Sequence, residues 1–339
     1  MRVMLEAIPN CLRDIMIEAS HILRLAGRVG SPSRATPRSK GFMPALIVTI
    51  LALTATSAFA ASSTSFYVVA HEDDWQLFMG LNAALDVPGA DSKTVFVHTT
   101  AGDAGLGTGT GGTPVPYYLA RENEALSAIR FLANLGVVGA GPSAAVSINT
   151  INGKDLRRVA YRNTVAYFLR LPDGNVNGGR GYPSTGNQSL LLLSLGSIPQ
   201  LSAIDGSATY SEWTDLVETL RGILLYEAQG SPDVWINVPD TNPLINPSDH
   251  PDHVYTGLAM LDAIAPLQCV NAALFTGYAA ATMTLNLETD ALMLQTGLWA
   301  VTTSALTDSY QLSTWDPGHN AFLGRQYFRI LAGTGACAF

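Results

Sequence analysis

Charge is scarce in this chain of 339 residues. Only 14% of the residues are charged, and 19 basic residues stand against 27 acidic ones, which gives a formal net charge of −8. Proteins that bind nucleic acid normally present a basic face, so this balance argues against a nucleic-acid partner. With 47% apolar residues, the chain is also unlike a disordered polyelectrolyte. The composition therefore predicts a globular protein.

Long apolar runs are few, and the clearest one lies near the N-terminus. Residues 1–40 carry seven basic side chains, residues 43–53 are almost entirely apolar, and Ala58-Phe59-Ala60 follows. A basic flank, a short apolar stretch and an A-x-A site are typical of a secretory signal, which predicts cleavage after Ala60. The alternative is a membrane anchor, although the run is shorter than the ~20 residues that a spanning helix needs.

These features predict a leader and signal peptide in residues 1–60 and a single domain in residues 61–339. A domain of that size can bury one large core. We expect a secreted or extracellular protein with no stable membrane partner after signal removal. The leader is unusually long, and the sequence leaves open whether Met1 or Met43 is the true start.

Cysteine is also rare. Cys11 lies in the expected leader, which leaves Cys269 and Cys337 in the mature chain. An exported protein can join two such residues in a disulfide, and two unpaired buried thiols are equally compatible with the sequence. The choice stays open because a sequence gives no distance between the two residues.

Short apolar runs alternate with helical patterns along the expected domain. We expect strands at 65–70, 94–100, 144–151, 165–171, 234–238 and 274–278, and helices at 74–87, 117–135, 211–227, 250–267 and 288–306. Ser211 is expected as an N-cap, and residues 175–210 as a loop or insert. The alternation predicts an α/β, Rossmann-like fold with a mainly parallel sheet and helices on both faces. The active site of such a sheet lies at the carboxyl ends of its strands.

Histidine is scarce too, yet three of the five histidines in residues 61–339 fall in two clusters rich in carboxylates. The clusters are Ala70-His-Glu-Asp-Asp74, at an expected strand end, and Asp249-His-Pro-Asp-His253, at an expected helix start. Imidazole and carboxylate together suit Zn²⁺ or a similar divalent cation. Within each cluster, a spacing of three residues lets one helical turn present two side chains on one side.

Other residues have simpler interpretations. Acidic residues at helix starts also complement the helix dipole, and Asp249 can serve only that purpose. His98 and His319 stand alone in the sequence, and we interpret them as structural or peripheral. The segment 107–112 fits GxGxxG, but prolines follow it instead of a helix, so it predicts a flexible loop at the rim of the site.

Taken together, the two histidine clusters resemble the PIG-L/LmbE family of zinc-dependent N-acetylglucosamine-type de-N-acetylases. The segments 102–105 (GDAG), 121–124 (RENE) and 171–174 (LPDG) support this resemblance, which spans roughly residues 65–265. One departure is visible, since the family usually has Pro where this chain has Glu72. That proline contributes a rigid turn and no ligand, so the resemblance still implies an intact site.

The resemblance implies a role for each matching residue. His71, Asp74 and His253 would hold zinc or another divalent cation, Asp73 would be the general base, and His250 would polarise the amide carbonyl or protonate the leaving amine. The positions where the family binds its sugar correspond to Asp103, Arg121 and Asp173. From the residues alone, Asp252 or Asp249 could orient His250 as an outer carboxylate.

These observations predict a secreted metal-dependent hydrolase with a small-molecule or glycan substrate. It would remove an acetyl group from an N-acetylated sugar or glycoconjugate by zinc-activated water. The alternative is a non-catalytic carbohydrate-binding or cell-surface module that retains the fold and the metal. A binding module has no need of Asp73 and His250, and this separates the two hypotheses.

Overall fold

A computed structural model describes residues 61–89, 91–139 and 141–339. The expected leader, the signal and the cleavage site after Ala60 lie outside the described residues. Within the described ranges, none of the helices combines the length and the apolar character needed to cross a membrane.

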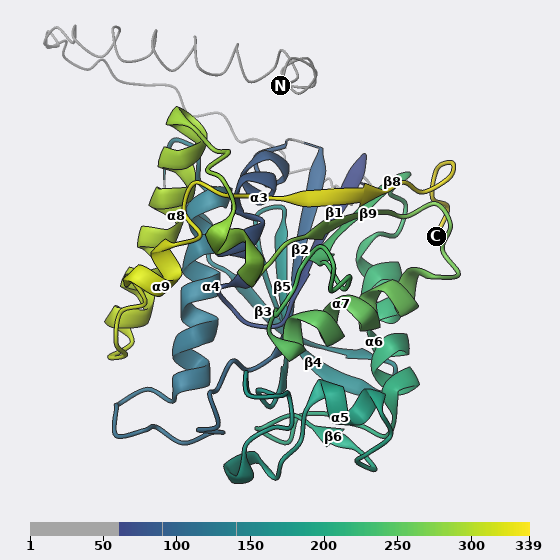
Figure 1. Cartoon of the computed structure of the whole chain (residues 1–339). Coiled ribbons are helices and arrows are strands. Elements are labelled where there is room, and N and C mark those ends of the chain that lie inside the picture. Colours follow the sequence, from purple (N-terminus) through teal and green to yellow (C-terminus); the bar gives the residue numbers. More distant parts are fainter. Residues whose placement is uncertain (1–60, 90, 140) are drawn as a thin grey trace, which may run out of the picture. The chain divides into compact units, whose positions relative to one another are not determined.

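An eight-stranded sheet with the order β10-β9-β8-β1-β2-β5-β4-β3 forms the centre of the described chain (Figure 1). Neighbouring strands from β9 to β5 run parallel, whereas β10, β4 and β3 are antiparallel to their neighbours. This architecture confirms the expected α/β fold with a mainly parallel sheet. The strands are β1 (Ser63–Val69), β2 (Ser92–Thr100), β3 (Ala145–Ile151), β4 (Lys154–Tyr161), β5 (Thr164–Leu171), β8 (Asp233–Pro239), β9 (Asn271–Phe275) and β10 (Phe328–Leu331).

Helices lie against both faces of the sheet (Figure 1), with α4 and α8 on one side and α6 and α7 on the other. They are α2 (Asp74–Phe78), α3 (Gly80–Asp86), α4 (Tyr117–Ala133), α5 (Leu190–Ser194), α6 (Trp213–Glu227), α7 (Pro251–Ile264), α8 (Thr289–Asp308) and α9 (Pro317–Asn320). Two short strands, β6 (Leu201–Ser202) and β7 (Thr209–Tyr210), form a separate sheet.

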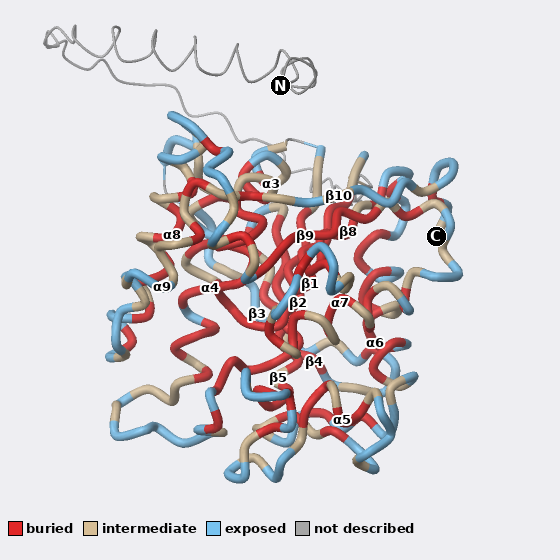
Figure 2. The backbone as a smooth tube through the Cα atoms, in the orientation of Figure 1, coloured by how far each residue is buried: buried red, intermediate tan, exposed pale blue. Residues whose placement is uncertain are grey.

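The alternation of side chains along the buried strands builds two hydrophobic cores. In β1, Phe66 and Val68 join the core that packs against α6 and α7, while Tyr67 and Val69 join the core that packs against α4 and α8. Successive side chains of a strand point to opposite faces, so a strand covered on both faces is apolar throughout. Figure 2 shows the central strands buried, with the exposed segments at the periphery.

Several expected elements differ in detail from the structure. The helix expected at 74–87 is divided at Met79 into α2 and α3. β4 and β10 were not expected, because β4 interleaves charged side chains and β10 is a short edge strand. The expectation for 175–210 was incomplete, since this segment contains α5, β6 and β7.

Ser211 is not the N-cap that the sequence predicted. Helix α6 begins at Trp213 after Glu212, and the carboxylate of Asp215 accepts hydrogen bonds from both the backbone N–H and the hydroxyl of Ser211. The serine therefore lies just before the helix and is held from within its first turn. An unexpected serine cap lies at α5, where the hydroxyl of Ser189 accepts from the backbone N–H of Leu192.

The two cysteines of the described chain are joined. Cys269, just before β9, forms a disulfide with Cys337 near the C-terminus, across a sequence separation of 68 residues. The segment between them contains β9, α8, α9 and β10. The disulfide thus ties the last part of the chain back to the central sheet.

Candidate metal centre and its cavity

The two histidine clusters meet at the carboxyl edge of the sheet. His71 lies two residues after β1, and Asp173 lies two residues after β5. Asp74 begins α2, and His250 is the N-cap of α7, which follows β8. Parallel strands bring their carboxyl ends to one edge, so segments far apart in the sequence converge there.

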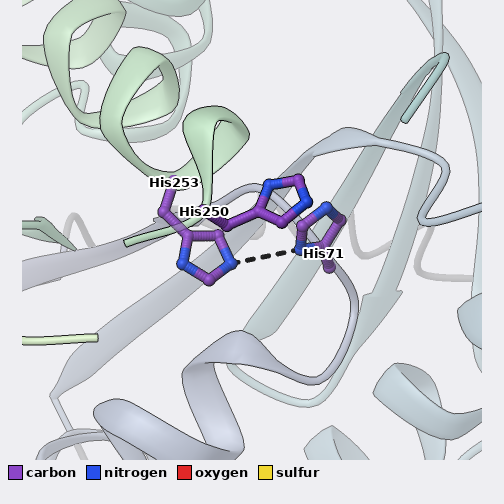
Figure 3. A group of neighbouring side chains, drawn as sticks. All are labelled: His71, His250 and His253. Carbon is purple, nitrogen blue, oxygen red and sulfur yellow. Dashed lines mark hydrogen bonds between the residues drawn. The ribbon is translucent and has the colours of Figure 1, made fainter. Parts of the chain in front are cut away.

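Three potential metal-binding atoms lie close together. Nδ1 of His71 is 3.2 Å from Nε2 of His253 (Figure 3), and Oδ1 of Asp74 is 3.1 Å from the same Nε2 and 3.6 Å from Nδ1 of His71. Tetrahedral ligands at zinc bond lengths of about 2.0–2.1 Å lie roughly 3.3 Å apart. We call His71, Asp74 and His253 the ligand triad.

A carboxylate lies beside the outward-facing nitrogen of each imidazole. Nδ1 of His253 is 2.9 Å from Oδ1 of Asp249, and Nε2 of His71 is 3.5 Å from Oδ2 of Asp252. With the ring proton on the outer nitrogen, each ring presents a lone pair to the carboxylate of Asp74. Such outer partners are usual for metal-binding histidines, since they fix the tautomer and the ring orientation.

The triad attracts positive charge. Burial lowers the pKa of both imidazoles, but the carboxylates outweigh it: Asp74 with Asp252 at His71, and Asp74 with Asp249 at His253. The pKa of both histidines is therefore raised well above the usual value. A bound proton or a metal ion would relieve the repulsion among the three inward-facing acceptor atoms, and two imidazoles with one carboxylate are a donor set that suits a divalent metal ion.

Asp249 does not cap helix α7, whose N-cap is His250. Besides pairing with His253, its carboxylate accepts hydrogen bonds from the side-chain amide of Asn246 (2.6 Å) and from the backbone N–H of Tyr278 (3.1 Å). Its pKa is lowered, because the attraction of His253 and these hydrogen bonds outweigh burial. The loop after β9 thereby helps to fix the orientation of His253.

His250 is oriented by a backbone hydrogen bond. Its Nδ1 accepts from the backbone N–H of Asp252 at 3.1 Å, while the Asp252 carboxylate is 3.8 Å from that nitrogen and accepts from the backbone N–H of Gly174 at 2.7 Å. In the neutral ring, Nε2 consequently carries the proton. Burial, and then the neighbouring His71, lower the pKa of His250 to about 4.

Behind the triad lies a buried cluster of charges around Arg121. Its guanidinium donates two hydrogen bonds to the carboxylate of Asp73, at 2.9 and 2.7 Å. It also lies 2.9 Å from Oε1 of Glu124 and 3.5 Å from Oε2 of Glu72. Arg121 lines the cavity, as its expected sugar-binding role requires, but its donors face these carboxylates.

Within this cluster, the pKa values of Asp73 and Glu72 are shifted in opposite directions. Burial raises the pKa of Asp73, but Arg121 outweighs burial and His319 adds a smaller effect, so this pKa is lowered. Burial dominates at Glu72 and raises its pKa to about 8 despite Arg121. Glu72 thus belongs to the same buried cluster, in contact with Arg121.

The two remaining residues implied in sugar binding have different surroundings. Asp103 is fully buried and does not line the cavity; its carboxylate accepts from the backbone N–H of Asp173 at 2.9 Å and of Gly107 at 2.8 Å. It thus links the loops after β2 and β5. Asp173 does line the cavity, and its carboxylate also accepts from the backbone N–H of Asn175.

A cavity of about 520 Å³ opens beside the triad. One wall, which we call the strand-end wall, carries His71, Asp73, Asp74, Asp173 and His250. The lining also includes five residues that follow α8, which we call the C-terminal wall: Thr314, Asp316, Gly318, His319 and Phe322.

His319, which we interpreted from the sequence as structural or peripheral, lines this cavity. The sequence could not show this position, because the packing of α8 against α4 brings α9 to the cavity. His98 is structural, as expected, since it is fully buried and its ring stacks on Phe168 with centroids 4.8 Å apart.

Two other groupings of possible ligands overlap the triad. Potential ligand atoms of His71, His250 and His253 lie within 4.8 Å of one another, and so do those of His71, Asp173, His250 and Asp252. Asp74 accepts a backbone hydrogen bond from the N–H of His71 at 2.7 Å, as Asp252 and Asp173 do from other residues, so such bonds do not separate the sets. The triad atoms lie 3.1–3.6 Å apart and do not depend on His250, whose Nδ1 accepts a backbone hydrogen bond, so we take the triad as the candidate donor set.

Comparison with known proteins gives distant similarities of fold. No family model matches the chain, and no curated protein matches it. Among solved structures, the chain is similar to an N,N'-diacetylchitobiose deacetylase from Pyrococcus horikoshii, with 17% identity and a TM-score of 0.42 over 81% of this chain and 85% of that one. It is also similar to GalB, a 4-carboxy-2-hydroxymuconate hydratase from Pseudomonas putida, with 12% identity and a TM-score of 0.39 over 77% and 82% of the two chains. At these values neither similarity argues for a function, which must come from the site.

Proposed function

We propose that the chain is a secreted, zinc-dependent hydrolase that removes an acetyl group from an N-acetylated sugar or glycoconjugate. One observation carries the proposal. Two imidazole nitrogens and a carboxylate oxygen, each 3.1–3.6 Å from the others and supported by outer carboxylates, lie at a cavity that also contains Asp73 and His250.

The ligand triad would hold the metal through Nδ1 of His71, Oδ1 of Asp74 and Nε2 of His253. Three protein ligands leave a coordination position open, as in catalytic and not structural zinc sites. When bound, a divalent cation supplies a Lewis acid for the amide carbonyl and lowers the pKa of water to about 7.

The chain's own residues supply the proton transfers and the positioning. Asp73 is adjacent to a ligand, outside the triad and at the cavity, so we assign it to accept the proton of the attacking water and return it to the leaving amine. Arg121 fixes the orientation of this carboxylate through its two hydrogen bonds. His250, kept neutral by burial, would donate its Nε2 proton as a hydrogen bond to the carbonyl oxygen.

Size and lining of the cavity support a substrate of sugar size. A volume of about 520 Å³ lies in the range of sites for small molecules. Tyr117, Tyr182 and Tyr278 line it, and aromatic rings of this kind can pack against the apolar face of a sugar.

Secretion has support from two separate features. The N-terminal pattern of basic, apolar and A-x-A segments resembles an export signal. The disulfide between Cys269 and Cys337 suits an oxidising compartment, because such bonds are rare in the cytosol.

One observation favours the second candidate function, a carbohydrate-binding module without catalysis. Both oxygens of Asp73 are bound by Arg121, and the lowered pKa of Asp73 makes this carboxylate a weaker base. A catalytic Asp73 therefore requires one of its oxygens to turn toward water when substrate is bound.

Acetate release from a panel of N-acetylated sugars tests the proposal. The purified protein should release acetate in a saturable reaction that a chelator abolishes and added zinc restores. Saturable sugar binding without acetate release would favour the binding module. Acetate release that is indifferent to the chelator would contradict the metal-dependent mechanism.

A further inference from the structure

The C-terminal wall of the cavity contains a histidine with a fixed ring. Nδ1 of His319 is 2.7 Å from Oδ2 of Asp316, while Oδ1 of Asp316 accepts from the backbone N–H groups of Gly318 (2.8 Å) and His319 (3.2 Å). Both oxygens of this carboxylate are thus engaged within one turn. The ionised Asp316 holds the His319 proton on Nδ1.

The ring of His319 is also held from one face. It stacks on Trp299 of α8, with centroids 5.7 Å apart and an interplanar angle of 22°. The indole N–H of Trp299 in turn donates to the side-chain oxygen of Asn320 in α9 (3.1 Å). Trp299 is fully buried, so a rigid platform supports the imidazole.

These contacts leave one nitrogen of His319 available. Within residues 61–89, 91–139 and 141–339, Nε2 of His319 has no hydrogen-bond partner. His319 lines the same cavity as Asp73 and His250. With the proton on Nδ1, Nε2 of the neutral ring is a hydrogen-bond acceptor. A group that pairs with it must be a donor, such as a hydroxyl.

Packing alone does not account for this arrangement. The side chains of His319 and Asp316 are 36% and 43% exposed, so their interaction contributes little to a buried core. Fixing a half-exposed imidazole at a cavity wall serves recognition, because a rigid acceptor loses little entropy when a ligand binds.

We propose that His319 is a substrate-binding residue whose Nε2 accepts a hydrogen bond from a hydroxyl of the acetylated substrate, and that Asp316 is the residue that positions it. The proposal rests on the function proposed above and names a determinant of its specificity. It places the polyhydroxylated part of the substrate against the C-terminal wall while the amide lies at the strand-end wall. An acetamide without hydroxyls would gain nothing from this contact.

Two variants and two substrates test the proposal. His319→Asn keeps an amide N–H that can reach Asp316 and removes the distal nitrogen, whereas His319→Gln places an amide oxygen near the position of Nε2. The probes are N-acetylglucosamine, which carries hydroxyls, and N-methylacetamide, which carries none. Thermal unfolding and zinc content of each variant confirm that fold and metal site are intact.

His319→Asn should lower kcat/KM on N-acetylglucosamine about tenfold relative to N-methylacetamide, as expected for one hydrogen bond, mainly through KM. His319→Gln should recover part of that loss. An equal loss of kcat/KM on both probes would assign His319 a structural role and overturn the proposal. Unchanged kcat/KM on both probes would overturn it as well.

Binding separates this proposal from the proposed function. If the wild-type protein hydrolyses neither probe, the dissociation constant of N-acetylglucosamine is measured by titration. A roughly tenfold weaker binding in His319→Asn would then support the His319 contact while the hydrolase assignment fails. Unchanged binding, or no binding by the wild type, would overturn the contact as well.

Discussion

The two walls of the cavity are built in different ways. His71, Asp74 and His253 on the strand-end side are almost fully buried, and each has an outer partner or a strand end that fixes it. His319 and Asp316 on the C-terminal wall are partly exposed and lie on a helix of four residues. From this difference we infer separate roles for the two walls. Metal binding would belong to the rigid edge of the sheet, and substrate selection to the more exposed segment.

The support of the C-terminal wall is also different. It follows α8, which packs against α4, and the side chain of Gln311 donates to the hydroxyl of Thr113 and the carbonyl of Val115 in the loop after β2. The disulfide closes a covalent loop that contains the whole wall. Each of the following predictions separates the contributions of the two walls, from the largest expected effect to the smallest.

His253→Ala should produce the largest effect. It removes a ligand nitrogen, so zinc content and hydrolysis should both fall by more than the ~10²-fold that losing an outer partner costs. The matched control is His319→Ala, which removes a histidine from the C-terminal wall and should keep its zinc. Full zinc occupancy in His253→Ala, by metal analysis of the dialysed protein, would contradict the triad.

Replacing both Cys269 and Cys337 by serine should destabilise the fold. Closing a loop with a separation of 68 residues stabilises a protein by about 4 kcal/mol in the chain-entropy model. Urea unfolding monitored by fluorescence measures the loss, and zinc binding should persist because the triad lies outside the loop. Zinc loss in the folded double variant would show that the walls depend on each other.

Asp73→Asn should retain zinc and lower hydrolysis by at least ~10²-fold, the contribution expected of a general base. Asn preserves the size of the side chain but does not accept a proton at neutral pH. Arg121→Lys is the companion variant, since lysine provides no bidentate pairing and should leave Asp73 less well oriented. Unchanged turnover in Asp73→Asn would remove this residue from the mechanism and favour the binding module.

Asp249→Asn should have the smallest effect among the variants around the metal ligands. The amide oxygen can still accept from Nδ1–H of His253, but the negative charge is lost, so zinc affinity should fall about tenfold. Competition with a chromophoric chelator measures the affinity. The isosteric Asp316→Asn on the C-terminal wall is the control, and a similar loss of zinc there would contradict the separation of the two walls.

The sequence predicted the strand-end wall well because its residues occupy the ends of strongly patterned elements. The apolar run before His71 and the helical pattern after His253 place both clusters at the carboxyl edge of a parallel sheet. A sequence could not show that Asp249 pairs with His253, or that Arg121 holds Asp73. Those contacts depend on side-chain directions that only the packed helices determine.

The C-terminal wall could not be predicted in the same way. His319 has no second histidine nearby, and its position follows from the packing of α8. The segment Asp316-Pro-Gly-His319 does contain a signal, because an aspartate before proline is a good N-cap and reaches a side chain three residues later. That signal identifies a fixed histidine and not the cavity beside it.

The most direct test of the metal centre is anomalous X-ray diffraction at the zinc edge from crystals of the zinc-loaded protein. We expect one peak about 2.0–2.2 Å from Nδ1 of His71, Oδ1 of Asp74 and Nε2 of His253. A peak bound by His250, in either of the groupings that contain it, or no peak at this edge of the sheet, would contradict the ligand triad.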